Sequence, residues 1–568
     1  MLSWYKDRLL LALVSLLTLG SGLMFRSPWP PDEPRFAAVA RDMVESGQWF
    51  FPSIGGHLYP DKPPVFMWLQ ALIQKCTGSI DLAFLLPGLL ASVLAVLAVQ
   101  DLAARLWNRR TAWWAAGALL LSFQFIWQAH AGQIDALLCG FTTLALYGFA
   151  RHFLLGPAWG WYAASGVFMG LGVLTKGVGF LPLLALIPAG VLAWKRPAGL
   201  GWKPQSSWTH ILWILAPLLM ILTIAAWLVP MVFQVAHAHS TELCAYRDEI
   251  LGRQTVDRYA KAWHHHKAFW YYLPTLLLMW VPLTLLLPWC IMPLWRRLRR
   301  LDKNTVFFLG TSALIILFFS LSAGKRGVYI LPALPAFALA IAPLLPGLAR
   351  RREIRIFARS LLVFLGLATL CAAAGILCFE WVKDLSFLAK YQDRFQFLAQ
   401  GTQRNIAACG FLIAGWIILR LAWRRAFALK HFGLALASAW IAIPIGLWPW
   451  LDPQLSSRAL MRQINQVVIE SGGTTLGMVD WREQMYLQAV GQVRTFAHRA
   501  EGEQVQREFD DAIRWLAQDP GNRLLIAKDR AETMKTTSGC TLDLSKSYDL
   551  GRHNRMEWCL VGPTAIRE

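Results

Sequence analysis

The chain alternates long apolar runs with short polar connections over most of its length. Apolar stretches that can cross a bilayer of about 30 Å occur about thirteen times, so a polytopic α-helical membrane protein with about thirteen transmembrane helices is predicted. The first run follows Lys6 and Arg8 and lacks a small-residue cleavage site after it, so we expect a retained helix rather than a signal peptide. The stretches lie near residues 8–25, 81–105, 111–128, 134–153, 158–174, 177–194, 209–232, 270–294, 304–322, 328–346, 357–379, 405–423 and 431–450.

Lys and Arg gather in every second connection between these runs. The positive-inside rule places such connections in the cytoplasm, which predicts a multi-pass membrane protein with its N-terminus inside. The longer polar segments, residues 26–80, 235–269, 380–404 and the tail from 451, then face outward. The basic connections contain Arg105–Arg110, Lys195–Arg196, Trp295–Lys303, Arg350–Arg359 and Arg420–Lys430.

Composition supports a membrane protein and argues against nucleic-acid binding and cysteine-based chemistry. Of 568 residues, 56% are hydrophobic and only 16% are charged, as expected of a membrane protein. The net charge of +21 does not indicate a nucleic-acid partner, because the cations lie in short clusters between apolar runs. The nine cysteines include no CxxC pair, which argues against zinc or thioredoxin-like chemistry. For Cys540 and Cys559 in the tail, a disulfide and two free thiols both stay open.

The polar segments at either end of the chain predict folded structure. Residues 33–46, followed by Gly47, and residues 64–75 have helical spacing and are expected to form interfacial helices. Amphipathic stretches at 458–470 and 505–517 alternate with strand-like runs at 474–480, 522–529 and 556–562. We therefore expect a transmembrane domain over 1–450, with loops 26–80 and 235–269 as a lid, and a periplasmic α/β domain over 451–568.

Acidic residues stand at the predicted outer ends of two helices. Asp32 and Glu33 directly precede the first interfacial helix, and Asp135 lies just inside the run at 134–153. Capping of a helix N-terminus by the carboxylate is the simplest reading of Asp32 and of Asp135. A catalytic role is the alternative, because cations gather on the same predicted side.

Cations in short outward connections run against the positive-inside preference and need a reason to be there. An anionic ligand is one such reason, and snorkelling side chains are another. For the three consecutive histidines, headgroup-level packing competes with a phosphate contact or with a single metal ligand, His265. The candidate residues for binding a phosphate are Lys62, Lys176, Arg253, Arg258, Lys325 and Arg326, with Tyr329 one helical step on. Together with the acids they indicate an outward cavity for a phosphorylated lipid, with carboxylates for proton transfer or acceptor orientation.

Six motifs in order carry a family resemblance: "PDEPRFAAVARDM", "YPDKPP", "QIDALL", "LTKG", the loop leading to "FWYYLP", and "KRGVYILPALP". Over residues 25–345 the chain resembles the aminoarabinose transferases of lipid A, within the protein-mannosyltransferase-like branch of the GT-C glycosyltransferases. The resemblance implies an undecaprenyl-phosphate-linked sugar donor and a lipid A acceptor. It also implies a location in the bacterial inner membrane, with the active site and the C-terminal domain facing the periplasm. It further implies Asp32 as the principal catalytic residue and Asp135 as the second carboxylate of the cavity, and we count the adjacent Glu33 as a third catalytic candidate. Lys62, Arg253, Lys325 and Tyr329 would hold the donor phosphate, assisted by Lys176, Arg258 and Arg326.

Departures from the family pattern leave several points open. Asp61 stands where lipid A-modifying members commonly have Glu, and "DEPRF" replaces the usual sequence of the first motif. Another sugar with a polysaccharide, glycolipid or protein acceptor is therefore the alternative, and a polyprenyl-lipid flippase is the alternative from another class. A divalent metal held by Asp32, Asp61 and a histidine such as His265 is also open. We expect a monomer and a single in-line displacement that inverts the anomeric configuration.

Overall fold

The computed structural model describes residues 2–195, 209–252, 267–379, 401–424 and 428–567, apart from 499, 501, 538, 554 and 555. The chain divides into two compact units. The membrane unit comprises Met1–Leu23, Asp61–Phe66 and Leu85–Leu447. The C-terminal unit comprises Met24–Pro60, Met67–Phe84 and Trp448–Glu568, so a segment near the N-terminus belongs to the same body as the end of the chain.

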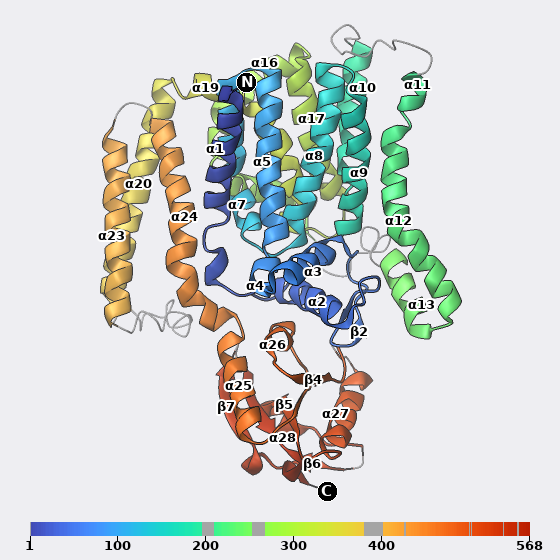
Figure 1. The fold of residues 1–568 in the computed structure, drawn as a ribbon. Coiled ribbons are helices and arrows are strands. Elements are labelled where there is room, and N and C mark those ends of the chain that lie inside the picture. Colours follow the sequence, from blue (N-terminus) through green and yellow to red (C-terminus); the bar gives the residue numbers. More distant parts are fainter. Residues whose placement is uncertain are drawn as a thin grey trace. The chain divides into compact units, whose positions relative to one another are not determined.

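Helices make up the membrane unit, and Figure 1 shows most of them running side by side. Among the described residues, eight helices are long and apolar enough to cross a membrane, or nine if the bent pair Phe269–Met279 and Thr284–Arg299 counts as one span. The helices of this part are α1 (Leu2–Leu19), α5 (Leu86–Leu106), α6 (Arg109–Leu120), α7 (Phe123–Ala129), α8 (Ile134–Leu155), α9 (Trp159–Lys176), α10 (Leu186–Lys195), α11 (Thr209–Leu212), α12 (Leu215–Ala238), α13 (Thr241–Asp248), α15 (Tyr272–Met279), α16 (Leu287–Arg299), α17 (Lys303–Leu321), α18 (Leu334–Ile341), α19 (Leu345–Leu348), α20 (Arg352–Leu377), α23 (Gly401–Trp423) and α24 (Ala428–Leu455). Short 3₁₀ segments are η1 (Leu23–Phe25), η2 (Leu181–Ala185), η5 (Phe269–Tyr271), η6 (Thr284–Leu286) and η7 (Gly327–Ala333).

The predicted stretches are all helical, but several are interrupted. The stretch near 111–128 is two helices, α6 and α7, and the stretch near 270–294 is bent by 96° between its two halves. The stretches near 177–194 and 328–346 each contain a 3₁₀ segment, η2 with Pro182 and η7 with Pro332. Proline lacks an N–H and disfavours a regular helix interior, which explains why apolar composition alone overstated the length of these helices.

Small residues let the central helices approach closely. A Cβ on Gly140 of α8 would lie 2.7 Å from the Ala91 Cβ of α5, and one on Gly148 would lie 2.2 Å from the Ser165 Oγ of α9. Gly166 of α9 meets the backbone of Ala216 in α12 in the same way. Such contacts are the usual means of helix association in a membrane, where burial of apolar surface supplies little driving force. They fix the positions of α8 and α9, which carry two of the candidate site residues.

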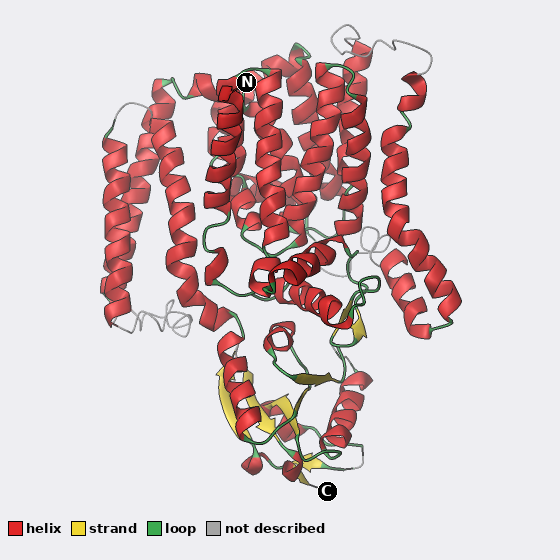
Figure 2. Ribbon diagram, viewed as in Figure 1, coloured by secondary structure: helices red, strands yellow, loops and turns green. Residues whose placement is uncertain are grey.

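The C-terminal unit combines helices with the strands of the protein, which Figure 2 colours yellow. Its helices are α2 (Glu33–Ser46), α3 (Val65–Thr77, entered from the membrane unit), α4 (Ile80–Ala83), α25 (Arg458–Glu470), α26 (Glu483–Gln488), α27 (Glu503–Leu516) and α28 (Lys528–Thr533), with 3₁₀ turns η10 (Leu544–Lys546) and η11 (Pro563–Ala565). Strands β1 (Ser53–Ile54) and β2 (His57–Leu58) form an antiparallel hairpin. The expected helices at 33–46 and 64–75 are confirmed as α2 and α3.

A mixed five-stranded sheet forms the core of the tail, in the order β4-β3-β5-β8-β7. Strands β3 (Thr475–Met478), β4 (Gln492–Thr495) and β5 (Asn522–Ala527) are parallel, whereas β7 (Tyr548–His553) and β8 (Met556–Val561) join antiparallel. A small antiparallel pair, β6 (Thr541–Leu542) and β9 (Ile566–Arg567), completes the fold. The predicted α/β tail is confirmed, with α25, α27, β3, β5 and β8 at the expected places. Cys540 and Cys559 are not joined by a disulfide in this structure.

Candidate active site

The structure brings together three candidate residues that lie far apart in the sequence. Lys176, the last residue of α9, donates a hydrogen bond to the Asp135 carboxylate at the start of α8. The Lys176 Nζ also lies 4.6 Å from the ring centroid of Tyr329, within reach of a cation–π interaction. Only 12% of the Lys176 side chain and 10% of the Asp135 side chain are exposed. The two charges are therefore held by each other in a mostly enclosed place.

The turn after Lys176 explains its position. Helix α9 ends at Gly177, whose φ of +80° is the left-handed conformation that glycine adopts without strain. The chain then folds back on the helix so tightly that a Cβ on Gly179 would lie 2.1 Å from the Val173 nitrogen. The sequence "LTKGVG" thus encodes a close turn that fixes the helix terminus carrying Lys176.

The connection between α17 and η7 holds the next two cations. Lys325 is 5% exposed, and its Nζ donates to the Ser322 carbonyl, so the cation folds back on its own turn. The Arg326 carbonyl accepts from the Tyr272 hydroxyl at 3.3 Å. The Gly327 carbonyl accepts from the Gln124 amide at 2.7 Å. Side chains from α15 and α7 therefore anchor the backbone of this turn.

Lys62 lies in the short segment that belongs to the membrane unit between two parts of the C-terminal unit. Its Nζ donates to the Asp61 carbonyl at 2.6 Å. Pro60, Pro63 and Pro64 flank the pair and restrict the backbone on both sides. The direction of the Lys62 side chain is thus constrained locally, as the sequence indicates.

Asp32 occupies the capping position of α2 but makes no side-chain cap hydrogen bond, so the simple capping interpretation is not supported. Its Oδ1 lies 3.9 Å from the Arg35 Nη1. Arg35 in turn donates through Nε to the Glu483 Oε1 at 3.1 Å, and the His498 Nε2 lies 3.6 Å from that same oxygen. A chain of charged groups thus links Asp32 to α26 of the C-terminal sheet domain.

Glu33, the neighbouring acid, has a different environment. Both of its carboxylate oxygens accept from Arg26, at 2.6 and 2.8 Å, and Oε2 also accepts from the Trp29 N–H at 2.8 Å. Arg26 is 4% exposed and Glu33 is 6% exposed. The Arg26 guanidinium also lies within 5.1 Å of the ring centroids of Trp29, Phe84 and Trp448. These contacts indicate that Glu33 fastens the segment before α2.

Sequence reasoning missed Asp42, which fastens α2 to the C-terminal domain. Its carboxylate accepts from the Tyr486 hydroxyl at 2.9 and 3.0 Å and from the Gly55 N–H at 2.7 Å. Burial raises the pKa of Asp42 above its usual range, and burial likewise raises the pKa of Tyr486 to about 12. Arg41 adds hydrogen bonds to the Tyr486 and Leu487 carbonyls. A lone Asp in an amphipathic helix gives no signal for a partner more than 440 residues away.

Three sequence-based candidates, Arg253, Arg258 and His265, lie outside the residues that the structure describes. The lid expected from 235–269 is therefore only partly described, through α13. Over the described ranges, no group of three or more His, Cys, Asp or Glu side chains is placed to hold a metal ion.

Comparisons with known proteins point to one class of enzyme. The family model described as dolichyl-phosphate-mannose-protein mannosyltransferase matches residues 61–227. An undecaprenyl phosphate-α-4-amino-4-deoxy-L-arabinose arabinosyl transferase of Pseudomonas savastanoi pv. phaseolicola is 31% identical over 377 residues, covering 65% of this chain and 67% of that protein. The enzyme of the same name from Pectobacterium atrosepticum is 32% identical over 429 residues, covering 69% and 72%.

A solved structure supports the fold over the whole chain. The crystal structure of ArnT from Cupriavidus metallidurans bound to undecaprenyl phosphate superposes with a TM-score of 0.71 and covers 98% of each chain. Sequence identity to that protein is 19%, so this comparison establishes the fold. This match confirms the expected GT-C membrane fold, whereas the described residues contain eight or nine candidate spans and not the expected thirteen.

Proposed function

This chain belongs to the undecaprenyl phosphate-α-4-amino-4-deoxy-L-arabinose arabinosyl transferase family, and we propose that it transfers aminoarabinose from undecaprenyl phosphate to lipid A. It is an integral membrane glycosyltransferase, so the flippase alternative is set aside. The proposal extends family membership to the donor sugar, the acceptor and the residues that act on them. Transfer of another sugar to a different envelope glycan is the competing possibility.

The contact of Asp135, Lys176 and Tyr329 is the observation that carries the proposal. It unites three of the six motifs through one buried ion pair and one aromatic ring. The Asp135 carboxylate fixes the direction of the Lys176 ammonium, which a phosphate-binding cation needs. We assign Lys176, Lys325, Arg326 and Tyr329 to the donor phosphate on this basis, with Lys62 as a further cation. Arg253 and Arg258 are assigned to the same task from the sequence alone.

The proposed reaction is a single displacement at the anomeric carbon of the donor. An acceptor oxygen forms the new bond to C1 while the bond from C1 to the phosphate oxygen breaks. Undecaprenyl phosphate leaves with the bonding electron pair, and positive side chains stabilise the charge that develops on it. In-line attack inverts the configuration.

Asp32 is the proposed catalytic carboxylate that orients the acceptor. A lipid A phosphate is already anionic, so it needs no base to remove a proton, and Asp32 then acts by positioning. A hydroxyl acceptor would instead require Asp32 to accept the proton. Arg35 lies next to the Asp32 carboxylate and is hydrogen-bonded to Glu483, so we assign Arg35 and Glu483 as positioning residues.

We place the catalytic residues within 1–450, including Asp32 in the part that folds with the C-terminal unit, and we assign 451–568 to a domain that acts from the periplasm. The distribution of Lys and Arg supports this orientation. The basic connections alternate along the chain with the connections that carry the candidate site motifs, so the two sets lie on opposite sides of the membrane.

Mass spectrometry of lipid A from cells that lack the gene tests the proposal. Complementation with the wild-type protein should restore a pentosamine mass on lipid A, and complementation with Asp32→Asn should not. Glu45→Gln, which changes an exposed acid of the same helix, is the matched control and should restore it. If lipid A is unchanged in the deletion strain and a sugar is missing from another envelope glycan, the assignment of lipid A as the acceptor is wrong. Full activity of Asp32→Asn would reject the assignment of Asp32.

A further inference from the structure

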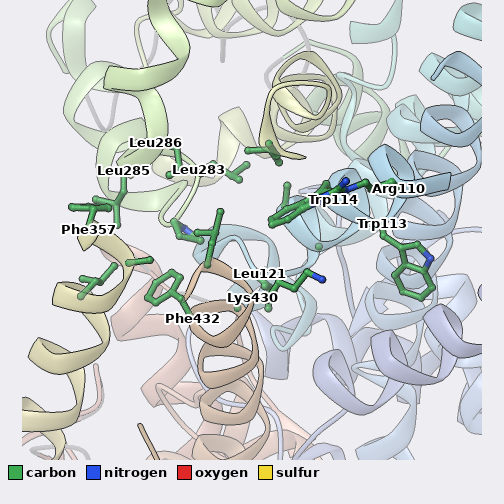
Figure 3. Close-up of a pocket in the computed structure, with 18 residues that line it drawn as sticks. Arg110, Trp113, Trp114, Leu121, Leu283, Leu285, Leu286, Phe357, Lys430 and Phe432 are labelled. Carbon is green, nitrogen blue, oxygen red and sulfur yellow. The ribbon is translucent and has the colours of Figure 1, made fainter. Parts of the chain in front are cut away.

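The membrane unit contains a second binding place, formed by helices that carry none of the candidate catalytic residues. A cavity of about 500 Å³ lies among α6, η6, α19, α20 and α24. A volume of this size is typical of a small-molecule or lipid-chain site. Figure 3 shows its interior, with Phe357, Phe432 and several leucines facing Arg110 and Lys430 across the space. The cavity is lined by Arg110, Trp113, Trp114, Gly117, Ala118, Leu121, Pro282, Leu283, Leu285, Leu286, Leu345, Phe357, Ala358, Leu361, Leu429, Lys430, Phe432 and Gly433.

The two charged residues lie at the same end of the membrane unit. Arg110 is the second residue of α6, and Lys430 is the third residue of α24. Both are the last residues of connections that are rich in Lys and Arg, and the positive-inside rule assigns these connections to the cytoplasm. Both side chains are exposed, so they lie at the mouth of the cavity rather than in its interior.

Neighbouring cations are already committed to acidic partners. Arg109 donates to Asp7 of α1, and Arg105 donates to Asp101 of α5. Among the described residues, the lining of the cavity includes no acidic side chain, and no ion pair is found for Arg110. The mouth is thus positive, while sixteen of the eighteen lining residues carry no charge.

We propose that this cavity binds an anionic phospholipid, with one acyl chain among the apolar side chains and the headgroup phosphate against Arg110 and Lys430. An apolar interior excludes a free phosphate, because a soluble anion would gain nothing from the sixteen uncharged residues. A neutral lipid would make no use of the two cations. This site is separate from the donor site proposed above and does not depend on that function.

The test uses the full-length protein, purified in mild detergent and depleted of lipid. Phosphatidylglycerol and phosphatidylcholine with identical acyl chains are added in turn, and bound lipid is measured by native mass spectrometry together with the thermal unfolding midpoint. Phosphatidylglycerol should bind preferentially and raise the midpoint. Arg110→Gln with Lys430→Gln should weaken that binding about thirtyfold, since each surface cation contributes about 1 kcal/mol to an anionic lipid contact. Arg352→Gln, an exposed cation that starts α20 outside the lining, is the matched control and should change nothing.

A second variant tests the interior independently of charge. A Cβ on Gly117 meets no atom within 4 Å, so Gly117→Leu should fill the cavity without disturbing the helix and should abolish phosphatidylglycerol binding. Equal binding of the two phospholipids, or binding that survives both sets of substitutions, would overturn the proposal. Displacement of phosphatidylglycerol by undecaprenyl phosphate, lost in Gly117→Leu, would also overturn it and assign the cavity to the polyprenyl tail.

Discussion

Lys176 at the end of α9 and Asp135 at the start of α8 form an ion pair that is almost fully enclosed within the membrane unit. Two motifs whose charged residues lie 41 positions apart in the sequence therefore act as one feature. In the sequence they are two separate features: Asp135 is an acid at the start of a helix, and Lys176 is a cation on the side of the membrane that the positive-inside rule disfavours. The pair satisfies both, because each charge compensates the other.

The ion pair predicts strongly non-additive substitutions. Asp135→Asn or Lys176→Gln alone should lower stability by about 3–5 kcal/mol, because each leaves a buried charge without its partner. The double variant should recover most of that loss but should remain inactive, since Lys176 is proposed to bind the donor phosphate. Thermal unfolding in detergent and a lipid A transfer assay measure the two effects. Additive losses of stability would show that the two side chains do not interact.

The two neighbouring acids of the first outer segment should respond differently. Glu33→Gln should destabilise the C-terminal unit by about 3–5 kcal/mol, because it leaves the buried Arg26 without a carboxylate. Limited proteolysis should then cut within 24–60. Asp32→Asn should leave proteolysis unchanged and remove activity. An equal loss of stability in both variants would contradict the separate roles.

The turn after Lys176 should tolerate no side chain at Gly179. In Gly179→Ala, the Cβ would lie 2.1 Å from the Val173 nitrogen, so the turn must move and Lys176 with it. We expect a loss of transfer of at least about tenfold, equivalent to 1.4 kcal/mol in the barrier. Gly190→Ala is the control, because its Cβ meets nothing within 4 Å in α10. Activity of Gly179→Ala equal to that of the control would show that the turn does not position Lys176.

Stability of the C-terminal domain should fall as the pH rises towards neutrality. Glu508 is buried on α27 and accepts from the Asp480 N–H at 3.1 Å, and its burial raises its pKa from 4.5 to about 7. Between these values the folded state holds a proton that the unfolded state has lost, so the free energy of unfolding decreases as pH increases. The expected loss is about 2 kcal/mol between about pH 5 and about pH 8.

Pulse proteolysis in urea, with fragments from 458–567 as the readout, measures this dependence in the full chain. Glu508→Gln should flatten it. Asp511→Asn, an exposed acid of the same helix, should leave it unchanged. A steep pH dependence that persists in Glu508→Gln would assign the effect to another group.

Local patterns in the sequence predicted local structure well. The helix at 33–46 begins and ends as expected, because Pro34 fits its first turn and Gly47 adopts a φ of +72° at its end. The tail strands β3, β5 and β8 follow runs of β-branched and apolar residues. The short edge strand β4 was missed, because "QVRT" alternates exposed and half-buried positions without an apolar core.

Long-range pairing could not be predicted in the same way. Motif order and chemistry placed Asp135, Lys176 and Tyr329 among the candidates, but nothing in their spacing specifies which charge meets which. The same holds for Arg26 with Glu33 and for Asp42 with Tyr486. These contacts depend on tertiary packing, and only the folded structure distinguishes a carboxylate that fastens a loop from one that faces a reactant.

The composition of the C-terminal unit has a consequence for how the protein is made. Arg35 and Asp42 leave the ribosome more than 440 residues before their partners Glu483 and Tyr486, and Asp32 belongs to the same early segment. Domains generally fold as they emerge during synthesis, but this body lacks its second half until the membrane helices between its two halves have been made. The segment that contains the proposed catalytic carboxylate therefore has no folding partner while the helices between the two halves are inserted into the membrane. A nascent chain that is released early would have a membrane bundle but no assembled reaction centre.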